Sequence, residues 1–309
     1  MDIKIENLTK KFGGQRAVDN ISFEVKTGEI VGFLGPNGAG KTTTMRIITN
    51  FIAPSGGKVY IGGKQLETEA DEIKKHIGYL PENNPLYQDM PVIDYLEFVA
   101  GLQGIPKEQI LPRVVEMIRI TGLNQEKHKR IGELSKGFRQ RVGLAQAMIH
   151  DPEILILDEP TSGLDPNQIV EIRKLIIELG KHKTVILSTH ILPEVEATCD
   201  RILIINQGRI VADGTSDLLK KQASGEDVLR VKIEDGETNV IFKAIQGLET
   251  TTQVSFVDGD NERFEIQCRS GSDTAREVFQ LCVKKKWTIT EIIPFETKLE
   301  DIFRKLTTN

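Results

Sequence analysis

Apolar residues recur along the first two thirds of the chain in short continuous runs, separated by segments with helical spacing. The runs lie at residues 30–34, 154–157, 184–188 and 202–205. Runs of this length are typical of strands that are buried on both faces of a parallel sheet. A helical pattern also occupies residues 167–180. Strands that alternate with helices in this way predict an α/β fold with a largely parallel sheet.

Two further patterns indicate additions to this core. Residues 3–8 and 21–25 alternate apolar and polar side chains, which predicts antiparallel strands with one solvated face. Residues 94–102 and 111–121 have helical spacing, and Pro91 fits a first-turn position for the first of these helices. We therefore expect an antiparallel β-subdomain near the N-terminus and a mostly helical subdomain over residues 85–150.

The character of the chain changes after residue 220. We interpret residues 1–220 as one domain, the polar residues 221–227 as a linker, and residues 228–309 as a second domain. The pattern of the second domain predicts a strand, a helix, two strands, a helix and a strand, at residues 228–233, 238–247, 253–258, 263–268, 273–285 and 288–293. This β-α-β-β-α-β order is expected of a small α+β domain of the ferredoxin-like type.

A last helix is expected to begin near Thr297. It carries an apolar stripe with i, i+3, i+4, i+7 spacing, which consists of Leu299, Ile302, Phe303 and Leu306. The stripe would pack either into the domain's own core or against a partner, and core packing is the simpler interpretation. Trp287, at the start of a predicted strand, is also expected to lie in the core.

Composition narrows the classes of protein that fit this organisation. With 309 residues there is room for about two domains. The chain has 40 Lys and Arg against 45 Asp and Glu, a net charge of −5, so no nucleic-acid partner is expected. The three scattered cysteines indicate reduced thiols in a cytosolic protein. No signal peptide and no apolar run of the ~18 residues that a membrane helix needs are expected, so a membrane role would require a partner.

A glycine-rich segment, GPNGAGKT, follows the run at residues 30–34 and precedes a helix. It fits the P-loop pattern, in which glycines let backbone N–H groups turn toward an anion and the helix N-terminus adds partial positive charge. Lys41 would contact the β- and γ-phosphates of a nucleotide, and Thr42 would bind Mg²⁺. The residues expected to bind the nucleotide here are Gly35, Pro36, Asn37, Gly38, Ala39, Gly40, Lys41, Thr42 and Thr43.

A second motif ends the apolar run at residues 154–157, where Asp158 and Glu159 follow in sequence. An apolar strand that ends in two carboxylates is a Walker B pattern when it is paired with a P-loop. Asp158 would hold Mg²⁺ through water, and Glu159 could act as the general base on the attacking water. A P-loop alone is shared by kinases, GTPases and motor ATPases, so the two motifs predict a nucleotide site without naming the machine.

The segment LSKGF, at residues 134–138, lies between these motifs and opens a predicted helix. Here the chain resembles the ATP-binding-cassette (ABC) family, whose signature is LSGGQ. The match keeps Ser135 and Gly137 and departs at Lys136 and Phe138. The resemblance implies that Ser135 and the backbone at Gly137 bind the γ-phosphate of an ATP held by a second subunit. Phe138 removes a polar side chain but leaves such backbone contacts available.

Further motifs of that family match in order. Asp165, in an SGLD segment, resembles the D-loop that connects the two sites of a dimer, and His190 resembles the switch histidine that contacts the γ-phosphate. The resemblance gives Phe12 the role of stacking on adenine and adds Val18 to the nucleotide contacts. Phe12 could instead be a core aromatic. Glu82 stands where a glutamine usually reaches Mg²⁺, and it could bind the metal or be a solvated loop residue.

The resemblance covers about residues 1–215 and implies the ATPase subunit of an ABC transporter, of the ABC-2 type exporter branch. It implies a homodimer or paired ATPase, ATP and Mg²⁺ at each interface, and a cytoplasmic location at the membrane through a separate transmembrane permease. Residues 83–95 would lie where the permease docks. An importer ATPase and a soluble cassette acting on ribosomes or DNA are the alternatives. A single P-loop and a short spacing between the Walker motifs argue against the latter.

Overall fold

The computed structural model describes residues 1–224, 227–257, 260–269, 271–295 and 299–307. The chain divides into two compact units, the first ending at Thr215 and the second beginning at Ser216. Among the described residues, no helix combines the length and the apolar character required to cross a membrane.

A six-stranded sheet forms the centre of the first unit, in the order β10-β9-β3-β8-β7-β6. Its strands are β3 (Ile30–Leu34), β6 (Ile77–Leu80), β7 (Ile154–Asp158), β8 (Thr184–Thr189), β9 (Arg201–Asn206) and β10 (Arg209–Gly214). All neighbouring pairs are parallel except β9 and β10, which form an antiparallel hairpin. The predicted parallel sheet is therefore confirmed, and each of the four apolar runs is one of its strands.

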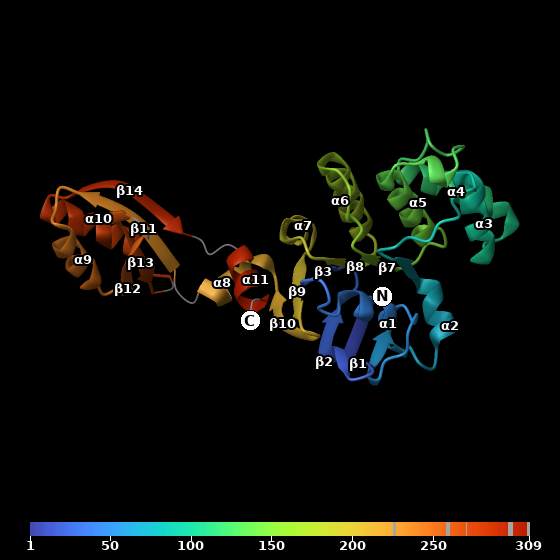
Figure 1. Cartoon of the computed structure of the whole chain (residues 1–309), viewed down its shortest axis with the longest axis horizontal. Helices are drawn as coiled ribbons and strands as arrows, with labels where there is room; N and C mark the ends of the chain where they lie inside the picture. Colours follow the sequence, from blue (N-terminus) through green and yellow to red (C-terminus); the bar gives the residue numbers. More distant parts are fainter. Residues whose placement is uncertain (225–226, 258–259, 270, 296–298, 308–309) are drawn as a thin grey trace. The chain divides into compact units, whose positions relative to one another are not determined.

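Both faces of this sheet are covered, which explains the continuous apolar runs. Ile154 and Ile156 pack with helix α1 (Lys41–Ile48), whereas Leu155 and Leu157 pack on the opposite side with helix α6 (Pro166–Gly180). Figure 1 shows α6 and α7 (Leu192–Thr198) on one side of the sheet and α1 on the other. The helix that follows the P-loop therefore packs directly against the Walker B strand β7.

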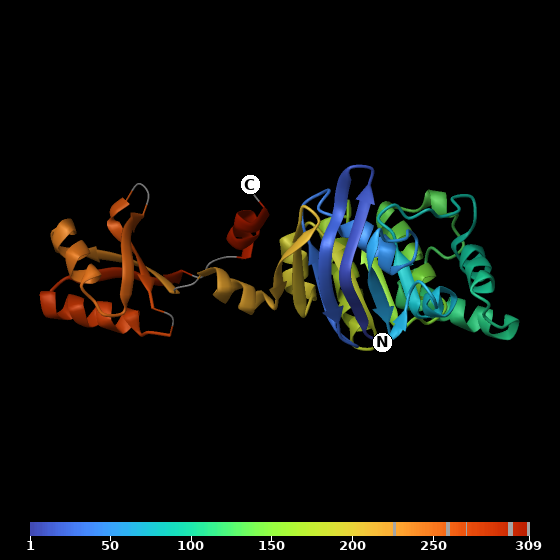
Figure 2. The same cartoon turned by 90° about the horizontal axis from the view of Figure 1, so that it is seen from below.

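An antiparallel sheet, in the order β2-β1-β4-β5, packs over α1. Its strands are β1 (Ile3–Phe12), β2 (Gln15–Val25), β4 (Gly56–Ile61) and β5 (Lys64–Gln65). The long pair β1 and β2 is visible side by side in Figure 2. The two strands run several residues further than the apolar alternation predicts, because they continue as a two-stranded hairpin beyond the core.

Helices dominate the segment between β6 and β7. They are α3 (Val92–Leu102), α4 (Lys107–Ile120) and α5 (Lys136–Met148), with a 3-10 turn at Ile131–Glu133; the shorter α2 (Ala70–Ile73) and a 3-10 turn at Lys74–His76 precede β6. Helix α4 begins directly after Pro106, one turn earlier than the periodicity predicts, and it contains Pro112. The first turn of α4 is polar, so its apolar spacing gives no sign of the helix there.

The second unit contains a four-stranded antiparallel sheet in the order β12-β13-β11-β14. Its elements follow as β11 (Asp227–Glu234), α9 (Thr238–Gln246), β12 (Thr251–Val257), β13 (Asp260–Cys268), α10 (Thr274–Lys285) and β14 (Thr288–Phe295). The order and the pairing are those of a ferredoxin-like arrangement. Trp287 packs against the core of this unit, as expected.

Two further helices belong to the second unit. Helix α8 (Ser216–Ser224) occupies part of the expected linker, so that prediction is wrong for residues 221–224. Helix α11 (Leu299–Thr307) contacts α8 and buries Leu299 and Ile302. The apolar stripe thus packs within its own unit, while the expected start at Thr297 lies outside the described residues.

Candidate nucleotide site

The carboxyl ends of the parallel strands open onto a cavity of about 360 Å³. It is lined by Ala17, Asn37, Gly38, Gly40, Lys41, Thr42, Thr43, Glu82, Glu159, Ser162 and His190. Ligands of open α/β sheets bind at this edge. Nine of the lining residues were predicted as site residues from the sequence motifs, Ser162 was named only as part of the SGLD segment, and Ala17 was missed.

The glycine-rich loop has a conformation that only glycine supplies at Gly40. Its φ is +110°, and a Cβ there would lie 2.4 Å from the carbonyl oxygen of Ala17. Strand β2 therefore touches the loop where helix α1 begins. Free backbone N–H groups at this N-terminus favour an anion in the cavity.

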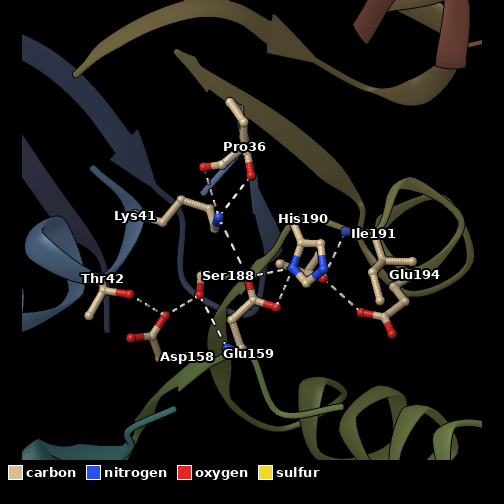
Figure 3. Close-up of polar contacts among 11 residues, drawn as sticks. Pro36, Lys41, Thr42, Asp158, Glu159, Ser188, His190, Ile191 and Glu194 are labelled. Atoms are coloured by element: carbon tan, nitrogen blue, oxygen red, sulfur yellow. Dashed lines mark hydrogen bonds and ion pairs between the residues drawn. The ribbon is translucent and has the colours of Figure 1, made fainter. Parts of the chain in front are cut away.

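Lys41 extends from the first position of α1 into this loop, and its side chain is only 6% exposed. Its Nζ donates to the carbonyl oxygens of Gly35 at 2.7 Å and Pro36 at 3.3 Å, and it lies 3.5 Å from Glu159 Oε1 (Figure 3). The ammonium group is thus held between the loop and the Walker B carboxylate. A phosphate in the cavity would meet a cation that is already in place.

Asp158, the last residue of β7, is fully buried. Its Oδ1 accepts hydrogen bonds from Thr42 Oγ1 at 3.3 Å and from Ser188 Oγ (Figure 3). Within the described part of the chain, its Oδ2 has no partner, and burial raises the pKa of the carboxyl group. An unpartnered carboxylate oxygen beside a threonine hydroxyl fits a Mg²⁺ site. Ser188 carried no motif and was missed.

Glu159 follows Asp158 in a left-handed conformation, with φ of 50°. Its N–H donates to the carbonyl oxygen of Ser188 at 3.0 Å and lies 3.2 Å from Ser188 Oγ, so strand β8 holds this unusual backbone. His190 Nδ1 lies 2.9 Å from Glu159 Oε2, and the histidine side chain is 43% exposed. Glu159 therefore lies between Lys41 and His190, at the cavity wall.

The expected adenine contacts behave differently from each other. Phe12 is 54% exposed at the end of β1, so it is not a core aromatic, and Lys10 Nζ lies 5.2 Å from its ring centroid. Val18 is buried in the core, and neither Val18 nor Phe12 is among the residues that line the cavity, so both contacts stay predictions. Side chains alternate along β2, and Ala17, one residue before Val18, lines the cavity.

Glu82 lies just beyond β6, is exposed, and lines the cavity. Its charge contributes to the raised pKa of Asp158, although burial is the larger cause. The carboxylate is consequently both solvated and close enough to the Walker B residue to act on it electrostatically.

The signature segment, residues 134–138, lines no part of this cavity. Ser135 is the N-cap of α5, and its Oγ accepts from the Phe138 N–H at 3.4 Å. Gly137 packs so closely against Gln168 that a Cβ would lie 2.5 Å from the Gln168 side chain. Phe138 packs partly against the core, and Lys136 is exposed. The chain thus separates its two predicted phosphate-binding segments.

Asp165 also lies outside the cavity, at the N-cap of α6. Its Oδ1 accepts from the Gln168 N–H at 2.9 Å, and Gln168 Oε1 accepts from the Asp165 N–H at 3.4 Å. This reciprocal capping gives Asp165 a role in the fold whatever else it contacts.

Comparison with known proteins adds four findings. The model of the ABC transporter family matches residues 18–162. An uncharacterized ABC transporter ATP-binding protein of Bacillus subtilis, YxlF, is 35% identical over 98% of this chain and 99% of its own length. The bacitracin transport ATP-binding protein BcrA of Bacillus licheniformis is 36% identical over 98% of this chain and 96% of its own. A dimeric ATP-binding cassette, MJ0796, solved in a post-hydrolysis state with ADP and Pi, aligns with a TM-score of 0.64 and 27% identity over 69% of this chain and 98% of that one.

Proposed function

Since this chain belongs to the ATP-binding subunits of ABC transporters, we propose that it hydrolyses ATP to drive export through a separate transmembrane permease. The observation that carries the catalytic part is the convergence of Lys41, Glu159 and His190 on one cavity beside Asp158. Export is supported by the similarity to a bacitracin transport subunit, which extends over both units of the chain.

The residues at the cavity take distinct roles in this proposal. The loop N–H groups and Lys41 bind the ATP phosphates, and Glu159 accepts the proton of the attacking water. His190 contacts the γ-phosphate. Phe12 offers a ring face to adenine.

Thr42 and Asp158 would hold Mg²⁺, with Glu82 as a third oxygen donor at the cavity wall. The ion would neutralise charge on the phosphoryl oxygens during transfer. Asp158 Oδ2 suits this role because it is buried and, among the residues described, without a partner. Burial makes the negative charge of Asp158 costly, as its raised pKa indicates, and a bound Mg²⁺ would offset that cost.

A homodimer completes the site in this proposal. Ser135 and Gly137 lie outside the cavity of their own chain, so they would serve the ATP of a second copy. Asp165 would connect the two sites. The dimeric form of a similar solved cassette supports this arrangement.

The permease is proposed to bind the helical segment and place the subunit at the cytoplasmic face of the membrane. Residues 83–95 follow directly after Glu82 and include Tyr87, which is exposed. The Tyr87 ring lies 5.7 Å from that of Phe98 and 5.9 Å from that of Tyr95. A permease bound to this aromatic cluster would contact a segment that follows the cavity residue Glu82 directly in the sequence.

Glu159→Gln tests the catalytic assignment. We expect ATP turnover to fall by at least about 100-fold with MgATP affinity retained, because the amide keeps the shape of the side chain but accepts no proton. The matched control is Glu178→Gln, on an exposed part of α6, which should leave turnover unchanged. Turnover of Glu159→Gln within a few fold of the unsubstituted protein would remove Glu159 as the base.

A further inference from the structure

Glu194 is a buried carboxylate that the proposed mechanism does not use. It lies in the first turn of α7 and is 4% exposed. Its Oε2 accepts a hydrogen bond from Thr189 Oγ1 at 2.8 Å, while its Oε1 has no partner within the described ranges. A buried carboxylate with one hydroxyl partner is costly for the fold, so its presence calls for an explanation.

The contacts of Thr189 supply that explanation. Thr189 Oγ1 donates to Glu194 and accepts from the backbone N–H of Ile191 at 3.1 Å (Figure 3). A carboxylate can only accept, so Glu194 fixes the direction in which the Thr189 hydroxyl donates. With its hydrogen directed at Glu194, Thr189 Oγ1 has a lone pair available to accept the hydrogen bond from the Ile191 N–H. The residues on both sides of His190 are held by one chain of hydrogen bonds.

We propose that Glu194 is a positioning residue that acts through Thr189 to hold His190 at the nucleotide cavity. The inference rests on the proposed role of His190 at the γ-phosphate. Among the described residues, Glu159 is the only side chain bonded to the His190 ring, with its Oε2 2.9 Å from Nδ1, and the histidine side chain is 43% exposed. Without the Thr189 hydroxyl, the Ile191 N–H loses its acceptor, whereas the bonds from the Gly35 N–H to the Thr189 carbonyl and from the Glu194 N–H to the Ile191 carbonyl remain. The segment that carries His190 is then held less tightly, and the ring can leave the position that catalysis requires.

Helix α7 does not depend on Glu194 for its place on the sheet. Val195 packs so closely on β3 that a Cβ added at Gly32 would lie 2.6 Å from Val195 Cγ1. Leu192 and Val195 are both buried. Removing the carboxylate should therefore disturb the His190 segment more than the packing of the helix.

The test compares Thr189→Val with Thr189→Ser. Valine keeps the volume of threonine but removes the relay, and we expect kcat for ATP hydrolysis to fall by about 10- to 100-fold with KM changed little. Serine retains the hydroxyl and should stay within about threefold of the unsubstituted protein. The exposed Glu196, also on α7, supplies the control Glu196→Ala, which should leave kcat unchanged.

A double variant separates positioning from stability. Thr189→Val leaves Glu194 buried without its hydroxyl partner, so the melting temperature should fall, and adding Glu194→Leu should restore it because both polar groups are then gone. The proposal expects kcat to stay low in the double variant. Recovery of kcat together with the melting temperature, or normal kcat in Thr189→Val, would overturn it.

The variant His190→Ala separates the proposed relay through Thr189 from the proposed role of His190 in ATP hydrolysis. Normal turnover in His190→Ala would remove the histidine role itself, and with it the reason for a relay. Loss of turnover in His190→Ala with normal turnover in Thr189→Val would leave the proposed function standing and refute the relay alone.

Discussion

The first unit contains two helix N-termini that are predicted to bind ATP phosphates, one in the chain's own site and one in the site of a second copy, yet they are built differently. Helix α1 begins after Gly40, has no side-chain cap, and opens onto the cavity with Lys41 already in place. Helix α5 begins after Ser135, whose hydroxyl caps its own helix, and it borders no part of that cavity. The first helix is thus prepared for an anion within its own chain. The N-terminus of the second helix is already capped by Ser135, so it can bind only a phosphate that a second copy of the chain holds.

The largest expected effect comes from removing the cation at the first terminus. Lys41→Ala should lower kcat by about 100- to 1,000-fold, because a preorganised donor to the transferring phosphoryl group is lost. ATP affinity, measured by equilibrium binding, should weaken by about 10- to 100-fold. The exposed Lys174 gives the control Lys174→Ala. Normal binding and turnover in Lys41→Ala would mean that α1 is not the phosphate site.

A smaller effect is expected at the second terminus. Ser135→Ala should lower turnover by about tenfold while ATP affinity of the monomer stays unchanged, because its own cavity does not include Ser135. Loss of the N-cap should also cost about 1 kcal/mol of stability, seen in chemical unfolding. Ser135→Thr keeps a capping hydroxyl and should recover most of both. Weakened monomer binding in Ser135→Ala would contradict the separation of the two termini.

The smallest effect is expected where the cavity meets the helical segment. Glu82→Gln removes a charge near Asp158, so the Mg²⁺ concentration for half-maximal hydrolysis should shift by a few fold while ATP binding is retained. Titration of Mg²⁺ at saturating ATP measures this shift. The exposed Glu97 on α3 supplies the control Glu97→Gln. An unchanged Mg²⁺ dependence would make Glu82 a solvated loop residue.

The difference between the two termini also shows how far sequence reasoning reaches. The loop at α1 and the helix that follows it were predicted, because strand, glycines and lysine are adjacent in the chain. Ala17 was missed because a one-residue change in strand register exchanges buried and exposed positions. Ala17 lines the cavity while Val18 beside it is buried, and a sequence pattern does not fix that register to a single residue.

Other features could not be predicted because they depend on distant contacts. Ser188 reaches Asp158 only because β8 lies beside β7 in the sheet. The Glu194 contact requires the bend between β8 and α7 that brings Thr189 within 2.8 Å. Phe138, by contrast, shows its departure from the family signature in sequence, but its packing against the core becomes visible only in the structure.

The central claim is that the cavity of one copy is completed by the signature segment of another. Light scattering of Glu159→Gln, which should bind ATP without turnover, tests this directly against the 34.6 kDa mass of the chain. We predict a dimer mass that depends on ATP, and its loss in Glu159→Gln combined with Ser135→Arg, with ATP affinity of the monomer retained. An ATP-dependent dimer that persists when Ser135→Arg is present would contradict the account.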